Sequence, residues 1–179
     1  VIHLKSLAKY QANNANLALV VAQNLQTIFP IDLDKAIGAL SQTQWKGRFE
    51  VILEPSRIII DGAHNEHGMS ALIESVDVLK HPLVAVFSAL RDKDTDGMIL
   101  DLLKVCDQVV VTHFEFHRSQ SLEMLAKDFK VISIEDPKEA IEKAYRLSDN
   151  GSLLITGSLY FISLVRQELL VQLKKEGVF

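Results

Sequence analysis

The residues best suited to chemistry follow a short apolar run in residues 57–76, which read RIIIDGAHNEHGMSALIESV. Asp61 stands where this run ends, and Gly62 directly after it allows other backbone to approach closely. A carboxylate in this place suits hydrogen bonds from the hydroxyl pair of a ribose, and it equally suits a turn that caps the next helix. The pattern leaves both interpretations of Asp61 open.

His64 and Asn65 stand at the start of the helix that we expect after Asp61. Backbone N–H groups and the helix dipole favour an anion there, so these side chains could help to hold a carboxylate or a phosphate. Simple helix capping explains Asn65 nearly as well. His64 does not fall on the apolar stripe of the helix, which favours a role at a site.

Two further polar residues flank other predicted strands. Arg48 follows Gly47 at the start of a predicted hairpin, where its guanidinium could grip two phosphate oxygens, although such an arginine is more often a solvated strand end. In TGSLY, residues 156–160, Gly157 lets the chain turn and Ser158 is placed to cap the last helix. Capping alone is the commoner explanation for such a serine.

Two patterns resemble metal sites but lack ligands. The stretch DKDTDG, residues 92–97, copies the opening of a calcium loop, yet Leu103 stands where the closing bidentate acid should be. Two histidine pairs lack a third ligand at a recognisable spacing, namely His113 with His117 and His64 with His67. We therefore expect no metal site within this chain, and we find no phosphate-cradling G-x-x-x-x-G-K-[ST] loop.

These candidate residues need a sheet whose strand ends meet at one edge. Five continuous aliphatic runs alternate with helical patterns, and such runs predict strands buried on both faces. The runs cover residues 57–60, 83–87, 108–111, 131–134 and 153–156. Right-handed crossovers then give an α/β fold, a mainly parallel sheet with helices on both faces. Because ligands bind beyond the carboxyl ends of such strands, we expect one cleft to be shared by Arg48, Asp61, His64 and Ser158.

Other signals predict where the elements begin and end. Apolar residues at helical spacing predict a helix over residues 11–26, and Asp32 can cap a second helix through Leu40. RFEVIL and RIII flank the short EPS and predict an antiparallel hairpin that opens the sheet. Asp136, Pro137 and Glu139 make a capping box before a later helix. The first helix between strands carries an apolar stripe at Met69, Leu72, Ile73, Val76 and Leu79.

Composition limits the classes of protein. A chain of 179 residues with 48% hydrophobic content fits one sizeable core. Its net charge of −4, with no long run of like charges, argues against nucleic acid or anionic membrane as a partner. No signal peptide or transmembrane stretch is visible, and the single Cys106 favours a reducing compartment, so we expect a cytoplasmic protein. The absence of an initiator methionine predicts a piece of a longer chain.

Five motifs together resemble the carboxy-terminal domain of bacterial dihydrofolate synthase/folylpolyglutamate synthase, within the Mur ligase superfamily. In chain order they are WKGRFEVI, IIIDGAHNEHGM, ALRDKD, VVVTHFEFHRS and LLITGSLYFISLVRQEL. DGAHN is the most specific, and the agreement runs from about Gln11 to the last helix. The resemblance implies a Rossmann-like ligase domain over residues 46–179, preceded by a helical segment from the interdomain junction over residues 1–45. It also implies an amino-terminal ATPase domain outside this chain.

The resemblance implies the activity of an ATP-dependent amide ligase. Enzymes of this family use ATP and Mg²⁺ to phosphorylate the carboxylate of dihydropteroate or a folate, and the amino group of L-glutamate then attacks the acyl phosphate. The phosphate loop and the magnesium site belong to the amino-terminal domain, so we expect this chain alone to be inactive. The sequence does not distinguish a bifunctional synthase from one that only extends the polyglutamate tail. Two alternative functions also stay open: a Mur-type ligase for another carboxylate, and a non-catalytic nucleotide-binding or partner-docking module.

The resemblance also implies roles for residues that bind the nucleotide. Asn14 matches the family segment H-Q-x-x-N-A near the adenine, Arg48 would touch the ATP phosphates, and Asp61 would hold the ribose. One departure is visible, because the family usually has Gly-x-His-Gln where residues 8–11 read Ala-Lys-Tyr-Gln. Tyr10 thus replaces the family histidine.

The incoming glutamate has its own implied residues. The resemblance assigns this substrate to His64, Ser158 and Tyr160, with His64 as the catalytic candidate. A fixed arginine such as Arg48 would stabilise the negative charge that accumulates on an acyl phosphate and its adduct.

Overall fold

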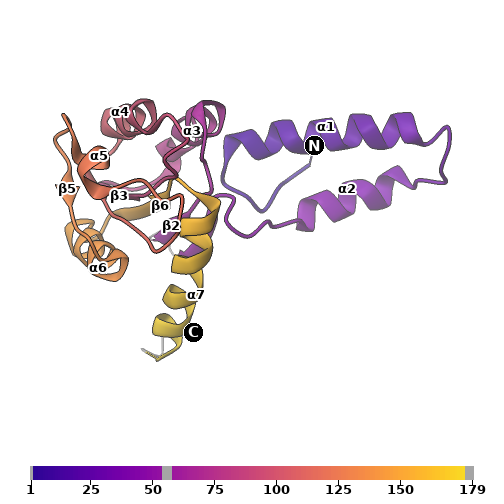
Figure 1. Cartoon of the computed structure of the whole chain (residues 1–179). Coiled ribbons are helices and arrows are strands. Elements are labelled where there is room, and N and C mark those ends of the chain that lie inside the picture. Colours follow the sequence, from indigo (N-terminus) through magenta and orange to yellow (C-terminus); the bar gives the residue numbers. More distant parts are fainter. Residues whose placement is uncertain (1, 54–57, 176–179) are drawn as a thin grey trace.

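A computed structural model gives the fold of the chain and describes residues 2–53 and 58–175. Within these residues six strands form one sheet in the order β1-β2-β6-β3-β4-β5 (Figure 1). β1 pairs antiparallel with β2, and every other neighbouring pair is parallel. The strands are β1 (Glu50–Leu53), β2 (Ile58–Ile60), β3 (Leu83–Phe87), β4 (Gln108–Val111), β5 (Ile132–Ser133) and β6 (Ser152–Thr156). The predicted mainly parallel sheet with one antiparallel hairpin strand is confirmed.

The central strands are apolar throughout because both faces of the sheet are covered. All residues of β3 and β6 are buried. Leu83, Ala85 and Phe87 belong to one core, whereas Val84 and Val86 belong to the other. The alternation of side chains along a strand therefore feeds two separate cores from one continuous hydrophobic run.

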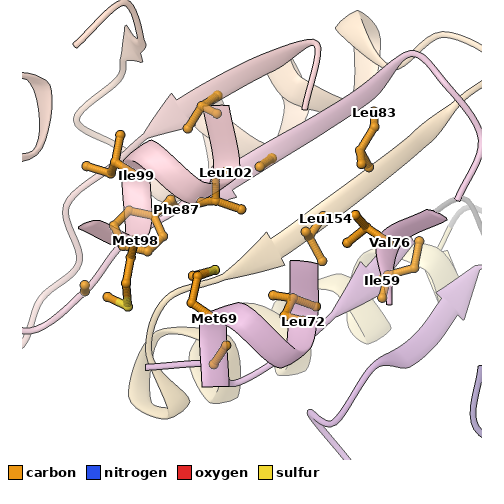
Figure 2. Close-up of a cluster of buried hydrophobic side chains, with 14 of the residues drawn as sticks. Ile59, Met69, Leu72, Val76, Leu83, Phe87, Met98, Ile99, Leu102 and Leu154 are labelled. Carbon is orange, nitrogen blue, oxygen red and sulfur yellow. The ribbon is translucent and has the colours of Figure 1, made fainter. Parts of the chain in front are cut away.

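Helices form a layer on each face of the sheet. The first layer contains α3 (Glu66–Ile73), α4 (Thr95–Val105) and α5 (Leu122–Ala126), and the second contains α6 (Pro137–Leu147) and α7 (Leu159–Lys175). Figure 2 shows the first core, in which Met69 of α3 and Met98 of α4 lie near Phe87 of β3. The predicted helices on both faces are confirmed.

The chain begins with a helical hairpin, formed by α1 (Lys9–Leu25) and α2 (Leu33–Gln42). Asp32 caps α2, and its carboxylate accepts a hydrogen bond from the backbone N–H of Lys35 at 3.1 Å. Neither helix has a buried residue, and Figure 1 shows the hairpin reaching away from the sheet. None of the helices in the described ranges has the length and apolar character that a membrane crossing requires.

Several predicted boundaries need correction. The apolar stripe that ends at Leu79 is not one helix, because α3 stops at Ile73 and Val76–Val78 form a 3₁₀ turn. The Ser75 hydroxyl donates back to the carbonyl of Ala71 and accepts from the N–H of Lys9, so it serves the α1 junction. β5 is shorter than predicted, with Ile132 and Ser133 as its two paired residues. The EPS connection and the first residue of the predicted run 57–60 lie outside the described residues.

The predicted cap and the predicted proline at the start of α6 are confirmed. Asp136 accepts a hydrogen bond from the N–H of Glu139 at 2.9 Å, and Pro137 occupies the first helical position. Such caps satisfy backbone donors that have no partner inside the helix. They fix helix starts locally, which is why they could be predicted without the fold.

Candidate functional site

An open cavity of about 1340 Å³ lies between the α1–α2 hairpin and the carboxyl end of β2. Of the predicted site residues, Asn14, Arg48, Asp61 and His64 line it. Asn14 is exposed on α1, where its amide donates to the Gln11 side chain at 3.0 Å. The site therefore joins residues from the first helix to residues at the edge of the sheet.

A tight turn before β1 positions Arg48. Gly47 has a φ of +69°, which favours glycine, and its N–H donates to the Glu50 carboxylate at 2.7 Å. The carbonyl of Gly47 accepts from the N–H of Gly62 at 2.9 Å. One guanidinium nitrogen of Arg48 donates to the carbonyl of Gly62 at 3.1 Å. Because a guanidinium has five N–H donors, this bond leaves others for an anion in the cavity.

The turn is anchored by Arg166, a residue of α7 that sequence reasoning did not single out. Arg166 also lines the cavity, and its guanidinium grips the Glu50 carboxylate through contacts of 2.7, 2.9 and 3.0 Å. Burial opposes ionisation of Glu50, but hydrogen bonds from Arg166 and Gly47 outweigh it and hold the pKa of this carboxyl below its ordinary value. Since 116 positions separate the partners, no local signal in the sequence links them.

Asp61 is only 2% exposed, and three donors surround its carboxylate. Its Oδ2 accepts from the Tyr10 hydroxyl at 2.6 Å and from the Phe49 N–H at 2.7 Å, and its Oδ1 accepts from the Ala63 N–H at 2.8 Å. Burial raises the pKa of Asp61 above the ordinary value, although these donors favour the charged form. The carboxylate thus ties α1, the turn before β1 and the loop after β2 together.

His64 shares a carbonyl with Arg48. Its Nδ1 lies 2.8 Å from the oxygen of Gly62, which also accepts from Arg48. A carbonyl only accepts hydrogen bonds, so this contact assigns the proton of a neutral imidazole to Nδ1 and leaves Nε2 as an acceptor. The guanidinium of Arg48 and the imidazole of His64 therefore meet at the Gly62 carbonyl on the wall of the cavity, and the Nε2 of His64 can accept a hydrogen bond.

The cap of α3 is Asn65, whose side chain accepts from the N–H of Gly68 at 2.7 Å. Of the two interpretations left open for Asn65, the structure shows the helix cap. The interpretation of Asp61 as the helix cap is wrong, because its oxygens face Tyr10, Phe49 and Ala63 instead.

Ser158 and Tyr160 are placed differently from the other predicted residues, and neither lines the cavity. Ser158 is buried, and its hydroxyl accepts from the N–H of Tyr160 at 3.2 Å in the first turn of α7. Tyr160 is 54% exposed as a whole residue. Its ring stacks on that of Phe116, and the ring centroids are 4.5 Å apart. Leu159, between them, lies so close to Gly62 that a Cβ on that glycine would come within 2.3 Å of its Cδ2. The expected shared cleft is therefore formed by Arg48, Asp61 and His64, whereas the Ser158 hydroxyl turns to the helix start.

The acidic residues of the calcium-like stretch make contacts within the protein. Among the described residues, no three His, Cys, Asp or Glu side chains gather closely enough to hold a metal ion. In the calcium-like stretch, Asp94 caps α4 by accepting from Gly97, and Asp92 forms an ion pair with Arg118 at 2.6 Å. Burial raises the pKa of the Cys106 thiol to about 12, so this cysteine is unsuited to nucleophilic chemistry at neutral pH.

The mainly parallel sheet, with Arg48, Asp61 and His64 in a cavity at its edge, agrees with the class of protein that the comparisons identify. A family model described as the Mur ligase, glutamate ligase domain matches residues 47–159, and the chain belongs to this family. Within it, the chain is similar to the dihydrofolate synthase/folylpolyglutamate synthase of Bacillus subtilis (strain 168). The two are 33% identical over 180 residues, which cover 94% of this chain and 41% of that protein. The predicted resemblance is confirmed.

Solved structures agree with this assignment. Mycobacterium tuberculosis folylpolyglutamate synthase complexed with ADP matches with a TM-score of 0.80 and 30% identity, over 93% of this chain and 41% of that chain. A bifunctional folylpolyglutamate synthase/dihydrofolate synthase with Mn, AMPPNP and L-glutamate bound matches with a TM-score of 0.72 and 27% identity, over 79% of this chain and 36% of that chain. The chain spans about two fifths of the length of these three proteins.

Proposed function

We propose that this chain is the carboxy-terminal part of an ATP-dependent ligase that adds L-glutamate to dihydropteroate or a (poly)glutamylated folate. The observation that carries this proposal is the junction of Arg48 and His64 at one carbonyl, on the wall of a cavity at the carboxyl end of β2. Relatives of the same fold whose names include ADP or AMPPNP and L-glutamate support this choice of ligands.

The nucleotide would lie in the cavity beside Arg48. The cavity has room for a nucleotide, and Arg48 offers N–H donors to phosphate oxygens. Asn14 would lie near the adenine and Asp61 near the ribose. ATP supplies the phosphoryl group that converts the substrate carboxylate into an acyl phosphate. Because the described residues hold no metal cluster, Mg²⁺ would be held mainly by an amino-terminal domain of the same protein.

Two side chains would then assist the attack on the acyl phosphate, Arg48 through its charge and His64 through a hydrogen bond. Arg48 would stabilise the negative charge that grows as the glutamate amino group attacks, and it would do so more strongly than in the ground state. The Nε2 of His64, left as an acceptor by the bond of Nδ1 to Gly62, would receive a hydrogen bond from that amino group. Ser158 and Tyr160 would bind the glutamate from the neighbouring end of β6.

Orientation would contribute as much as any side chain. The hairpin in residues 1–45 would lead from the interdomain junction, and residues 46–179 would form one wall of a cleft that closes against the ATPase domain. Closure would bring nucleotide and glutamate together. On this proposal the protein acts in the cytoplasm, and the 179-residue chain does not ligate glutamate alone.

A ligase assay on the full-length protein tests the proposal. It should consume ATP only with L-glutamate and dihydropteroate or a folate present, and mass spectrometry should show a product extended by one glutamate. Arg48→Ala should lower kcat by roughly 100-fold or more, and Asp61→Ala and His64→Ala should abolish most activity. Arg118→Ala, at an exposed ion pair, serves as the matched control and should keep its rate.

Three results contradict the proposal in different ways. Ligation restricted to a peptidoglycan precursor keeps the family but replaces the substrate. Nucleotide binding without ATP-dependent ligation favours a non-catalytic module. Unchanged rates for Arg48→Ala and His64→Ala remove these residues from the site.

A further inference from the structure

Tyr10 occupies the side of Asp61 that faces the cavity. The tyrosine lines the cavity and donates its hydroxyl proton to Oδ2 of Asp61 at 2.6 Å. Burial raises the pKa of Tyr10, and the charge of Asp61 raises it further, so the phenol stays a donor at neutral pH. Since Asp61 is only 2% exposed, a ligand hydroxyl in the cavity meets the Tyr10 hydroxyl at the same acceptor.

Of the donors to Asp61, Tyr10 is the one that can leave. The other two are backbone N–H groups of Phe49 and Ala63, each 3% exposed and held in the sheet edge and the following loop. Tyr10 instead belongs to the first turn of α1, a helix without a buried residue. Its ring is partly buried and packs against the first core, but the side chain also lines the cavity, which gives the phenol room to move away from Asp61.

We propose that the Tyr10 hydroxyl is an exchangeable stand-in for a ribose hydroxyl, and that Tyr10 sets how strongly the site selects ribonucleotides. This inference rests on the proposed function, because it needs a nucleotide in the cavity. On binding, a ribose hydroxyl takes over the acceptor on Oδ2 of Asp61 and the phenol moves into the cavity. The exchange also releases one of the bonds that attach α1 to the sheet, which links nucleotide binding to the position of the helical hairpin.

The exchange predicts a definite sign for Tyr10→Phe. In the natural protein a ribose hydroxyl replaces the Tyr10 hydroxyl as the donor to Asp61. The ribose hydroxyls therefore add little to the affinity for the nucleotide. In the variant the buried carboxylate lacks a side-chain donor until the ribose supplies one, and a hydrogen bond to a charged group is then gained on binding. ADP should bind about tenfold more tightly to Tyr10→Phe. ADP that lacks both ribose hydroxyls, 2′,3′-dideoxy-ADP, should bind both forms within about twofold.

Calorimetric titration of the full-length protein measures the four affinities. The ratio of ADP to dideoxy-ADP affinity should rise about tenfold from the natural protein to Tyr10→Phe. Tyr145→Phe, which lies on α6 away from the cavity, is the matched control and should leave this ratio unchanged.

A second measurement avoids dependence on the folding of the variant. The full-length protein is labelled at the Cζ carbon of tyrosine, and the signal that is lost in Tyr10→Phe is that of Tyr10. ADP should shift this signal as the phenol leaves Asp61, and dideoxy-ADP should leave it in place.

The outcomes separate the two proposals. An unchanged affinity ratio, or equal shifts of the Tyr10 signal with both nucleotides, overturns the exchange while nucleotide binding stands. Weaker ADP binding by Tyr10→Phe shows that phenol and ribose are held together, and it also overturns the exchange. Absence of ADP binding in every form contradicts the proposed function, and this inference with it.

Discussion

Replacing Arg166 by methionine removes the guanidinium that anchors Glu50 and keeps most of the side-chain volume. Glu50 is left with the single donor N–H of Gly47, so a partly buried carboxylate loses its counter-charge. The turn that positions Arg48 loses its anchor at the same time. We therefore expect lower stability of the chain and weaker nucleotide binding from one substitution outside the sequence neighbourhood of the site.

The magnitude follows from the geometry of the pair. Three N–H···O contacts between 2.7 and 3.0 Å join two side chains that are 23% and 18% exposed. Breaking a fully buried ion pair costs about 3–5 kcal/mol, and breaking an exposed one costs about 0.2–1 kcal/mol. The remaining exposure screens the pair, so we expect Arg166→Met to lower the free energy of unfolding by about 2–3 kcal/mol. That is a large part of the roughly 5–15 kcal/mol that a domain has.

Urea denaturation of the 179-residue chain measures this loss by linear extrapolation at constant slope. Arg118→Met is the matched control, because Arg118 pairs with Asp92 at 2.6 Å but the two side chains are 44% and 42% exposed. Because an exposed pair is screened by solvent, Arg118→Met should destabilise the chain much less than Arg166→Met does. Adding Glu50→Gln to Arg166→Met should restore part of the stability, since an amide is cheaper to bury than an unpaired charge. Equal losses in the two arginine variants would refute the reasoning from burial.

The remaining predictions concern two glycines and the acid range. Gly157→Ala should cost more than ~3 kcal/mol in urea denaturation, because φ is +113° and the new Cβ would lie 2.4 Å from the Ser88 carbonyl oxygen. Gly38→Ala, with no atom within 4 Å of the new Cβ, should instead stabilise α2 by about 0.5–1 kcal/mol, and a loss would contradict this. The lowered pKa of Glu50 means that its ion pair with Arg166 stabilises the fold above about pH 4.5 and fades as pH falls through the lowered pKa. The thermal midpoint of Glu50→Gln should therefore fall less than that of the natural chain between about pH 5 and pH 3, and parallel curves would rule the pair out as the cause.

Strands and helix caps depend on residues that are close together in the sequence, so they could be predicted from it. The runs at residues 83–87 and 108–111 match β3 and β4 residue for residue, because strands buried on both faces are mainly aliphatic, and only Gln108 at the start of β4 is exposed within these two strands. The caps at Asp32, Asn65 and Asp136 were also predicted, since each side chain reaches a backbone N–H three residues away. The same local logic placed Arg48, Asp61 and His64 beside strand ends, and these residues do share a cavity.

Only the tertiary structure decided how the site is held together. Tyr10 meets Asp61 across 51 positions, and Arg166 meets Glu50 across 116. Ser158 carries the same kind of strand-end signal as Asp61, yet its hydroxyl serves the start of α7. A hydrogen bond with a partner three residues away depends on local backbone geometry alone. A bond across the fold depends on which strand ends and helix turns the assembled sheet brings within 3 Å of one another, and no short stretch of sequence contains that information.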